Sequence, residues 1–320
     1  MKILILSLLL IVSCASHVRN PSSEPAVFTL HDLRDQIQRA KPGAVIVIDE
    51  ESFFDFSDEG TLVIDKKIHL KGIRTKGRSR PTLKNWKNPI PLISIKADGV
   101  IIEGLKLEGI ETDAKKQEII ELNRQGKKGV YSFPVTRGIH VLANNVVIKD
   151  CEISGFSHAA IFAENALNLL VERNYIHHNQ RWGLGYGVAL HLISTAKIFN
   201  NKFDHNRHSI AGSGSSGQIY EAGYNWFGKN HSDTPLDMHG GKDRGDGTQV
   251  AGKIVHIHHN TIRDAVNFAF IHRGIPQEFV IFEHNNLEHR DHSKVIGYYN
   301  LGSKDIPKSK FIYRENHLSE

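Results

Sequence analysis

The segment Val171-Glu-Arg-Asn-Tyr-Ile176 has a form that the chain repeats: an apolar residue, two further residues, usually Asn, one residue, and a second apolar residue. Other copies occupy residues 102–107, 148–153, 198–203, 257–262, 282–287 and 313–318, and a weaker copy ends at residue 227. The Asn position falls at Cys151, Asn174, Asn201, Asn225, Asn260, Asn285 and Asn316. These positions are 23, 27, 24, 35, 25 and 31 residues apart. Such a period, near two dozen residues with tolerated insertions, indicates a solenoid.

Each copy is predicted to be a short β-structure that contains a turn. Its apolar residues alternate with polar ones, and many are β-branched or aromatic. An Asn that recurs at one turn would stack on the Asn of the next coil, because Asn tolerates left-handed backbone and its amide can bond the amides above and below. The pattern of residues 40–320 resembles the right-handed parallel β-helix superfamily of pectate-lyase type. This resemblance implies an all-β fold, a single solenoid of stacked parallel strands.

The residues before the first predicted strand indicate a helical cap. Thr29 and Asp32 have the spacing of a capping box, with Asp in place of the usual Glu, and apolar residues follow at helical spacing until Pro42. A short helix here would cover the open end of the first coil. The polar stretch 111–128 interrupts the repeat and predicts an excursion from the side of the solenoid.

The N-terminus is typical of an exported lipoprotein. An apolar run over residues 3–12 is too short to span a bilayer, and it ends at Cys14 in a context that resembles the bacterial lipobox. We expect a signal peptide over residues 1–13, a tether over 14–25 and the β-helix domain over 26–320. Because Ala15 rather than Asp follows Cys14, the expected location is the cell envelope, lipid-anchored through Cys14, at the outer membrane if the host has one. An ordinary signal peptide with an incidental Cys is the alternative.

The composition favours an acidic partner weakly. The formal net charge is +5 and the pI is about 9.0, and a mild basic balance suits polyuronates or nucleic acid. The sequence contains no Lys/Arg cluster of the nucleic-acid-binding type, so nucleic acid is not an expected partner. The expected partner is an acidic polysaccharide, and the membrane is contacted only through the lipid anchor.

A second strand is predicted about a dozen residues before each Asn segment. The candidates are residues 138–141, 160–163, 188–192, 209–211, 236–239, 268–273 and 295–299. In a β-helix these strands stack about 4.8 Å apart, so outward side chains from several coils share one groove. The side chains expected to converge there are His191, Asp237, His239, His272, Arg273 and Tyr298, although a shift of one residue in register would turn any of them inward.

The longest insertion between regular repeats lies between Asn225 and Asn260, where we expect the functional site. Asp237 and His239 are the predicted central pair, because a carboxylate can orient a His that moves a proton near neutral pH. Arg273 is predicted to hold a sugar carboxylate through two nitrogens. The predicted catalytic set is Asp237, His239, His272, Arg273 and Tyr298, and the predicted substrate-binding set is His191, Tyr220, Tyr224, Trp226 and Arg244. The aromatic members of the second set would stack on sugars, with core packing as their alternative.

A metal-binding site is the competing interpretation of the residues around Asp237 and His239. Asp237 and His239, with His191 or His272 from adjacent coils, could supply the mixed nitrogen and oxygen ligands of a divalent metal, although no recognised metal motif is present. The histidines at 256, 258 and 259 flank Ile257, so at least two should point outward on another sheet or turn. His178, His205 and His289 occupy matching positions, which favours a stacked ladder.

The function predicted from these residues is a lyase acting on a uronic-acid glycan. Elimination needs a base, a cation beside the carboxylate and an acid, and His239, Arg273 and Tyr298 could take these roles in that order. Three alternatives stay open: a non-catalytic glycan-binding or envelope surface module, a glycoside hydrolase with paired carboxylates, and a C5-epimerase. The Asp-Pro-His-Asp motif of alginate epimerases of this fold is only faintly echoed by residues 235–239.

Overall fold

The computed structural model describes residues 29–87, 91–110, 116–263, 267–288, 295–300 and 307–319. The predicted signal segment 1–13, Cys14, the tether and His289 lie outside these residues, so the expectations for them stay predictions.

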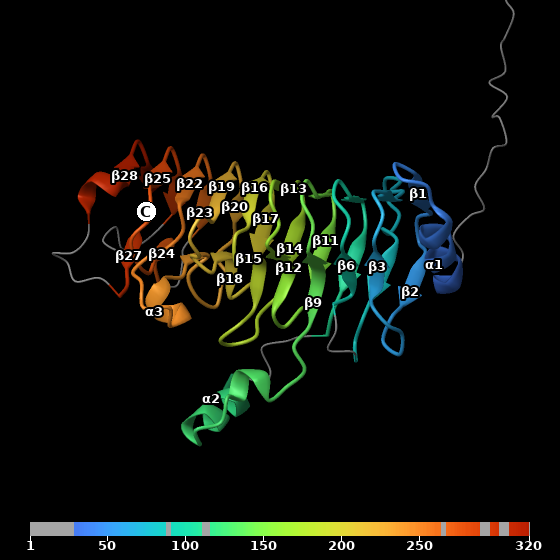
Figure 1. Ribbon diagram of the computed structural model, residues 1–320, viewed down its shortest axis with the longest axis horizontal. Helices are drawn as coiled ribbons and strands as arrows, with labels where there is room; N and C mark the ends of the chain where they lie inside the picture. The colour runs from blue at the N-terminus through green and yellow to red at the C-terminus, as the bar shows by residue number, and fades with distance from the viewer. Residues whose placement is uncertain are drawn as a thin grey trace, which may run out of the picture.

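Within the described residues, the strands form three parallel sheets of ten, ten and nine strands that wind into one β-helix (Figure 1). The chain visits sheets A, B and C in turn, and each strand pairs with the equivalent strand of the next coil. The predicted fold class, a single parallel β-helix with a short N-terminal helix, is confirmed.

Sheet A consists of β1 (Val45–Ile48), β4 (His69–Gly72), β7 (Ile101–Glu103), β10 (Val147–Lys149), β13 (Leu169–Glu172), β16 (Thr195–Phe199), β19 (Ile219–Gly223), β22 (Ile254–His258), β25 (Phe279–Glu283) and β28 (Phe311–Arg314). Sheet B consists of β2 (Phe53–Asp55), β5 (Thr82–Lys84), β8 (Lys106–Glu108), β11 (Glu152–Ser154), β14 (Tyr175–His177), β17 (Lys202–Asp204), β20 (Trp226–Phe227), β23 (Thr261–Arg263), β26 (Asn286–Glu288) and β29 (His317–Ser319). Sheet C consists of β3 (Leu62–Ile64), β6 (Ile93–Ile95), β9 (Arg137–Val141), β12 (Ala159–Glu164), β15 (Tyr186–His191), β18 (His208–Gly212), β21 (Leu236–Met238), β24 (Phe270–His272) and β27 (Ile296–Tyr298).

Alternate apolar residues of the strands build the core. Ile148, Val171 and Ile198 pair in register on three successive strands of sheet A, and all three are fully buried. Burying one such side chain stabilises the fold by about 1.5–3 kcal/mol. The apolar positions that the repeat shows in the sequence are therefore the inner columns of the solenoid.

The repeated Asn residues form a ladder at the turn from sheet A to sheet B. Asn174 donates its Nδ2 to the carbonyl of Ile148 at 2.9 Å and to Oδ1 of Asn201 at 3.0 Å. The same bonds recur at Asn201, Asn225, Asn260 and Asn285, and the ladder reaches Asn316. The predicted stacking of amides is confirmed.

The left-handed backbone of this turn lies one residue before the ladder, and not on the Asn as expected. Positive φ angles occur at Asp150, Arg173, Asn200, Tyr224, His259, His284 and Glu315. The ladder Asn therefore serves the turn through its hydrogen bonds and not through its tolerance of left-handed geometry. The residue before it bears the conformational strain.

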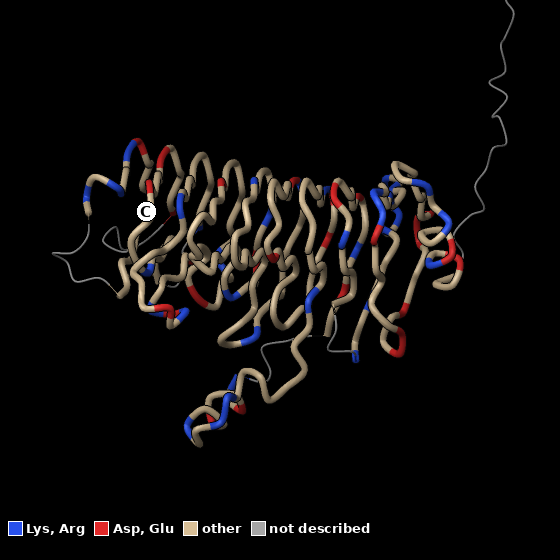
Figure 2. Tube along the Cα trace, viewed as in Figure 1, with Lys and Arg blue, Asp and Glu red and all other residues tan. Residues whose placement is uncertain are grey.

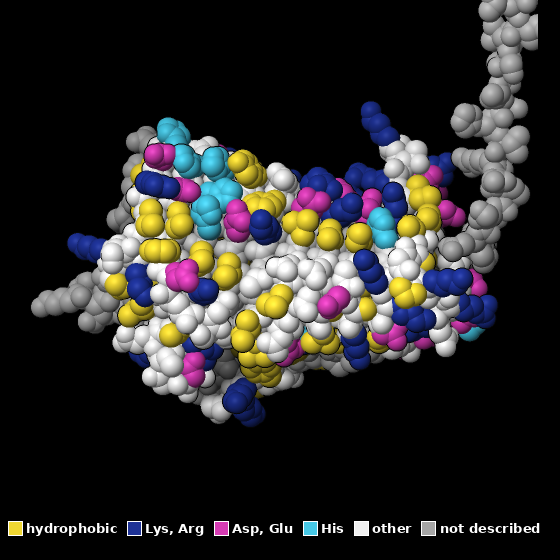
Figure 3. All heavy atoms as spheres, turned by 45° about the horizontal axis from the view of Figure 1, so that its top comes forward, with side chains coloured by type: hydrophobic (Ala, Val, Ile, Leu, Met, Phe, Trp, Pro, Cys, Tyr) yellow, Lys and Arg dark blue, Asp and Glu magenta, His cyan; other side chains and the backbone are white. Residues whose placement is uncertain are grey.

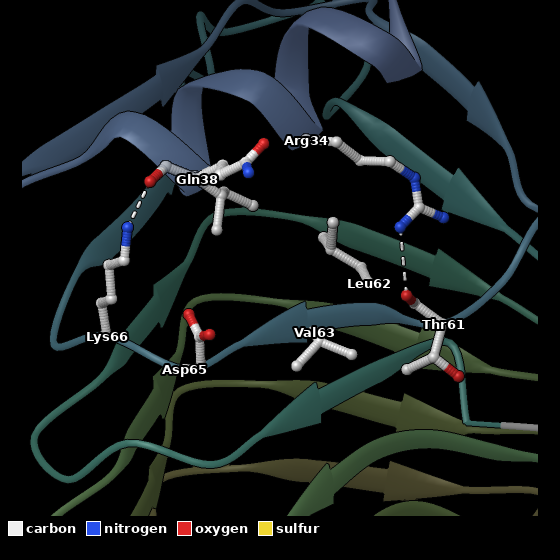
Figure 4. Close-up of a pocket in the computed structure, with 8 residues that line it drawn as sticks. Arg34, Gln38, Thr61, Leu62, Val63, Asp65 and Lys66 are labelled. Atoms are coloured by element: carbon white, nitrogen blue, oxygen red, sulfur yellow. Dashed lines mark hydrogen bonds between the residues drawn. The ribbon is translucent and has the colours of Figure 1, made fainter.

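Helix α1 (Leu30–Arg39) caps the first coil. Thr29 and Asp32 form the predicted capping box, with the backbone N–H of each residue donating to the side chain of the other at 3.0 and 3.1 Å. A shallow hollow lies between α1 and β3 (Figure 4), where Arg34 donates to the carbonyl of Thr61 and Lys66 donates to that of Gln38. These bonds tie the cap to the solenoid, so this hollow is part of the cap.

The predicted excursion contains helix α2 (Lys116–Arg124), which projects from the side of the solenoid (Figure 1). Acidic and basic residues are mixed along the coils and gathered on α1 and α2 (Figure 2). Among the described residues, no helix is long and apolar enough to cross a membrane.

Candidate functional site

A groove of about 520 Å³ runs along the outer face of sheet C. Its floor consists of Phe162, Ala189 and Ala211, which pair in register on β12, β15 and β18. Because two of these side chains are only methyl groups, the floor is low beside the larger residues on either side. Tyr131, which follows α2, contributes to the rim, so the excursion helps to shape the groove.

One end of the groove is aromatic and cationic. The Arg137 guanidinium lies 3.8 Å above the ring centroid of Phe162 and donates its Nε to Nδ1 of His158 at 3.0 Å. Burial, reinforced by the charge of Arg137, lowers the pKa of His158 to about 3. His191 lines the same groove and stacks on Phe162 at 5.6 Å between centroids.

The other end of the groove is organised by Asp237, which is fully buried on β21. Its Oδ1 accepts Nε of Arg273 at 2.8 Å, and its Oδ2 accepts Nη2 of the same guanidinium at 2.8 Å. Nε2 of His239 lies 3.1 Å from Oδ2. Burial alone would raise the pKa of Asp237, but the neighbouring His239, His208 and Arg273 lower it far below its usual range. The carboxylate is therefore ionised and fully engaged.

His239 is held between two carboxylates while still reaching the groove. Its Nε2 faces Asp237, its Nδ1 lies 3.8 Å from Oδ2 of Asp243, and its side chain is 29% exposed. Asp243 caps helix α3 (Gly241–Arg244) by accepting the backbone N–H of Gly240 at 3.0 Å. The insertion thus fixes the ring with one nitrogen toward Asp237, the orientation that a His base requires.

Tyr186 and His208 connect the two ends. Tyr186 lines the groove and its ring stacks on His208 at 5.7 Å. Burial is the main cause that raises the pKa of Tyr186. Nε2 of His208 lies 3.5 Å from Asp237 and 3.8 Å from Asp233 without a hydrogen bond, and burial lowers the pKa of His208 to about 4.

Arg244 lines the groove, but all three of its nitrogens stabilise the insertion. Its Nη1 donates to the carbonyl of Ser213 at 2.8 Å, its Nη2 to that of Val250 at 3.0 Å, and its Nε to Asp246 at 2.8 Å. Its main role is therefore to fix the loop, while its positive charge still faces the groove.

Of the five predicted catalytic residues, His239 lines the groove, Asp237 and Arg273 lie behind it, and His272 and Tyr298 point into the solenoid. His272 pairs in register with Met238 of the core and is fully buried, and Tyr298 pairs with His272 and packs edge-on against Phe311. The expected set was therefore out of register by one residue at these two positions. Arg273, the next residue after His272, was expected to hold a sugar carboxylate through two nitrogens, but its Nε and Nη2 both donate to Asp237, so that expectation was wrong. The structure likewise does not bring His272 to Asp237 and His239 as a third metal ligand.

The predicted aromatic platform is divided among three environments. Tyr220 is fully buried in the core, Tyr224 is exposed at the turn between sheets A and B, and Trp226 lies on sheet B, where Lys202 covers its ring at 5.0 Å. Residues close in sequence lie on different faces here because the solenoid turns between them. The three side chains therefore do not form one platform: Tyr220 packs in the core, which was the alternative interpretation, and none of the three lines the groove of sheet C.

Sequence reasoning missed four groove residues, Arg137, His158, Phe162 and Tyr186, and the buried His208 on which Tyr186 stacks. The sequence contains one signal that could have found two of them. Tyr186 and His208 precede predicted strands and occupy equivalent positions in successive coils, which places their side chains in one column. Arg137 pairs with Ala159 and Ala159 with Tyr186 in the same column.

The comparisons with known proteins agree with this architecture. The family model described as "Right handed beta helix region" matches residues 98–230 and 138–306. A search of curated proteins finds no significant match. Among solved structures, an alginate lyase from Paenibacillus sp. str. FPU-7 is 15% identical with a TM-score of 0.53, over 92% of this chain and 98% of that one.

Two viral proteins also have TM-scores slightly above 0.5. Tailspike protein 2 of Escherichia coli O157:H7 bacteriophage CAB120 is 11% identical with a TM-score of 0.51, over 80% of this chain and 32% of that one. ORF18 of Geobacillus virus E2 is 11% identical with a TM-score of 0.51, over 84% and 56%. At such identities the likeness concerns the fold alone.

Proposed function

This chain belongs to the right-handed β-helix family, and we propose that it cleaves an acidic polysaccharide in the groove of sheet C by elimination. The observation that carries the proposal is the groove itself, which combines aromatic rings and positive side chains with a His set against a buried carboxylate. Aromatic faces suit sugar rings, and Arg suits their carboxylates. The fold shared with an alginate lyase makes uronic-acid polymers the first substrates to test.

The groove follows the stacking direction of the strands. Its lining side chains come from β9 to β18 and from the insertion after β21, a span of about 19 Å at about 4.8 Å per coil. Arg137 therefore lies several coils from His239 and would bind a carboxylate of a distant sugar. Arg244, which lines the groove together with His239, turns its positive charge toward the reacting sugar, while Arg273 holds Asp237 behind His239.

The proposed reaction begins at His239. With Nε2–H donated to Asp237, its Nδ1 takes the proton from C5 of the uronate. The electron pair forms the C4–C5 double bond, the C4–O bond breaks, and the leaving oxygen takes the hydroxyl proton of Tyr186. Burial raises the pKa of this tyrosine and keeps its hydroxyl protonated before the reaction, and the nearby Arg207, which lowers the pKa, would stabilise the tyrosinate that remains afterwards.

Elimination is favoured over hydrolysis by the state of Asp237. Hydrolysis would use one carboxyl group as acid and a second as base or nucleophile. Asp237 is buried, its oxygens already accept hydrogen bonds from Arg273, and its pKa is lowered, so it carries no proton to donate. Its place is behind His239 as a positioning residue.

The test is incubation of the full chain with a panel of polyuronates while the absorbance of the unsaturated product is followed. We expect product from at least one polymer, and a loss of about 100-fold or more in His239→Ala and in Tyr186→Phe. His31→Ala, on the exposed face of α1, is the control and should retain full activity.

Other outcomes would replace the proposal. Retained glycan binding without product in the wild-type chain would identify a binding module. Deuterium incorporation at C5 in heavy water without chain cleavage would identify an epimerase. Neither binding nor product from any polyuronate would overturn the assignment of the groove.

A further inference from the structure

A second cluster of chemistry-bearing side chains lies on the outer face of sheet A, away from the groove. Figure 3 shows histidine side chains gathered toward the C-terminal end of this face. Glu221 on β19 and His256 and His258 on β22 each offer one ligand atom, and these atoms all lie within 4.8 Å of one another. Among the described residues, no other group of three His, Cys, Asp or Glu has this spacing.

The backbone places these three side chains by register. Glu221 pairs with His256, and Gly223 pairs with His258, two residues further along each strand. A Cβ on Gly223 would lie 2.5 Å from Cε1 and 2.9 Å from Nε2 of His258. The ring of His258 therefore occupies the space that the absent side chain leaves, and it leans toward Glu221, with Nε2 3.1 Å from Oε1.

Neighbouring groups fix both rings. Glu283 on β25 contacts Nε2 of His256 at 2.9 Å, and Nδ1 of His259 lies 3.0 Å from Nδ1 of His258. A metal-ligating His characteristically bonds a carboxylate or another acceptor through its second nitrogen, which fixes the ring and raises its basicity. Both histidines have such a partner.

We propose that Glu221, His256 and His258 bind a divalent transition-metal ion of the zinc type. Two imidazole nitrogens and one carboxylate oxygen form a donor set that zinc accepts, with water completing the tetrahedron. Magnesium and calcium prefer oxygen ligands alone and do not fit this set. The site is separate from the groove, since sheets A and C are different faces of the solenoid.

A similar pair on the same sheet shows what distinguishes this cluster. Nε2 of His69 lies 2.8 Å from Glu103, but Lys71 and Lys149 approach the same carboxylate at 3.7 and 3.2 Å. Lysine charges thus take the place of a cation there, and only one histidine contributes. Beside Glu221, Lys197 lies 3.8 Å from Oε2, while Oε1 faces His258.

The bound ion would act as a clip between two coils. β19 and β22 are neighbours in sheet A, yet the chain between them contains the long insertion with Asp237, His239 and Arg244. A metal that ligates one residue on β19 and two on β22 holds together the coils from which this insertion emerges. Metal binding should therefore stabilise the folded chain.

The experiment is calorimetric titration of the chelator-treated full chain with zinc chloride, with magnesium chloride as the negative control. We expect one equivalent of zinc per chain, a higher thermal midpoint with zinc, and no response to magnesium. Glu221→Gln and His258→Ala should each weaken zinc binding at least tenfold. His69→Ala is the matched control and should bind zinc as the wild type does.

Gly223→Ala tests the geometry while keeping all three ligands, and it should also weaken binding by displacing the His258 ring. The thermal midpoint of each variant is measured in chelator to identify any variant that does not fold. Such a variant is replaced by His256→Gln, because glutamine keeps much of the shape of the histidine side chain. The proposal is overturned if the wild-type chain binds no zinc, or if zinc binds with unchanged affinity to folded His258→Ala or His256→Gln.

Discussion

The ladder of asparagines and the cluster around Asp237 are both buried and polar, but their hydrogen bonds differ in kind. Each inner Asn, such as Asn225, bonds backbone carbonyls and N–H groups as well as the amides of its neighbours. The Asp237 cluster bonds side chain to side chain, through Arg273 and His239. It also leaves Nε2 of His208 without a hydrogen bond.

This difference in hydrogen bonding distinguishes the Asn amides, which stabilise the fold, from the side chains around Asp237, which are available for catalysis. An amide whose bonds are all satisfied by the backbone can change neither its charge nor its partners without loss of stability. Imidazoles and carboxylates that bond one another can exchange protons, and an unsatisfied buried atom marks a place where the fold tolerates a cost. The recurrence of Asn in the sequence therefore identifies the scaffold, and the exceptions to it identify the site.

Lowering the pH should have the largest effect on this comparison, because the ladder contains no group that acid protonates, whereas buried histidines gain a proton. Burial lowers the pKa of His208, His231 and His272 from 6.5 to about 4. The unfolded chain binds these protons near pH 6.5 and the folded chain only near pH 4. Because the unfolded chain is protonated first, each histidine lowers the free energy of unfolding by about 3 kcal/mol as the pH falls from 6.5 to 4, and has no such effect above pH 6.5.

Chemical denaturation at a series of pH values measures this loss. The His272→Phe variant, whose ring would lie beside Phe270 and Phe311, should lose about 3 kcal/mol less than the wild type between pH 6.5 and pH 4. Parallel curves for the variant and the wild type would contradict the assignment of a neutral, buried His272.

The sequence predicted the parts of this fold that repeat locally. The period of the Asn position, the capping box of Thr29 and Asp32 and the position of β21 all follow from residues close together along the chain. The ladder itself was also predictable, because each coil contributes the same residue at the same turn.

The groove was predictable only in part, because it is assembled across coils. Asp237, His239 and Arg273 were brought together as expected, but His272 and Tyr298 face inward. A strand of three residues has too little alternation to fix which neighbour faces out, and a shift of one residue inverts it. Tyr186 was overlooked because its importance depends on stacking over His208 of the next coil.

A substitution in the ladder should have the next largest effect. Asn225→Ala removes the acceptor for the backbone N–H and Nδ2 of Asn201 and leaves the carbonyl of Ile198 without its donor. We expect a loss of about 3 kcal/mol in the free energy of unfolding, measured by urea denaturation. Asn316→Ala, at the half-buried last rung, is the matched control and should cost about 1 kcal/mol, since water can replace its bonds. Equal losses in the two variants would show that burial does not make the inner rungs more costly to remove than the last one.

The smallest effect concerns the place where the ladder stops. Cys151 occupies the ladder position of its coil, and its N–H donates to Oδ1 of Asn174. Its Sγ lies 4.0 Å from the carbonyl of Ile102, which is the group to which an Asn amide at this position would donate. Cys151→Asn should therefore add one rung and raise the free energy of unfolding by about 1 kcal/mol in urea denaturation. Cys151→Ala provides no amide and should lower it slightly, by about 1 kcal/mol, through the cavity it leaves. If Cys151→Asn is no more stable than Cys151→Ala, backbone geometry and not the missing amide ends the ladder, and the ladder's bonds contribute less than their number suggests.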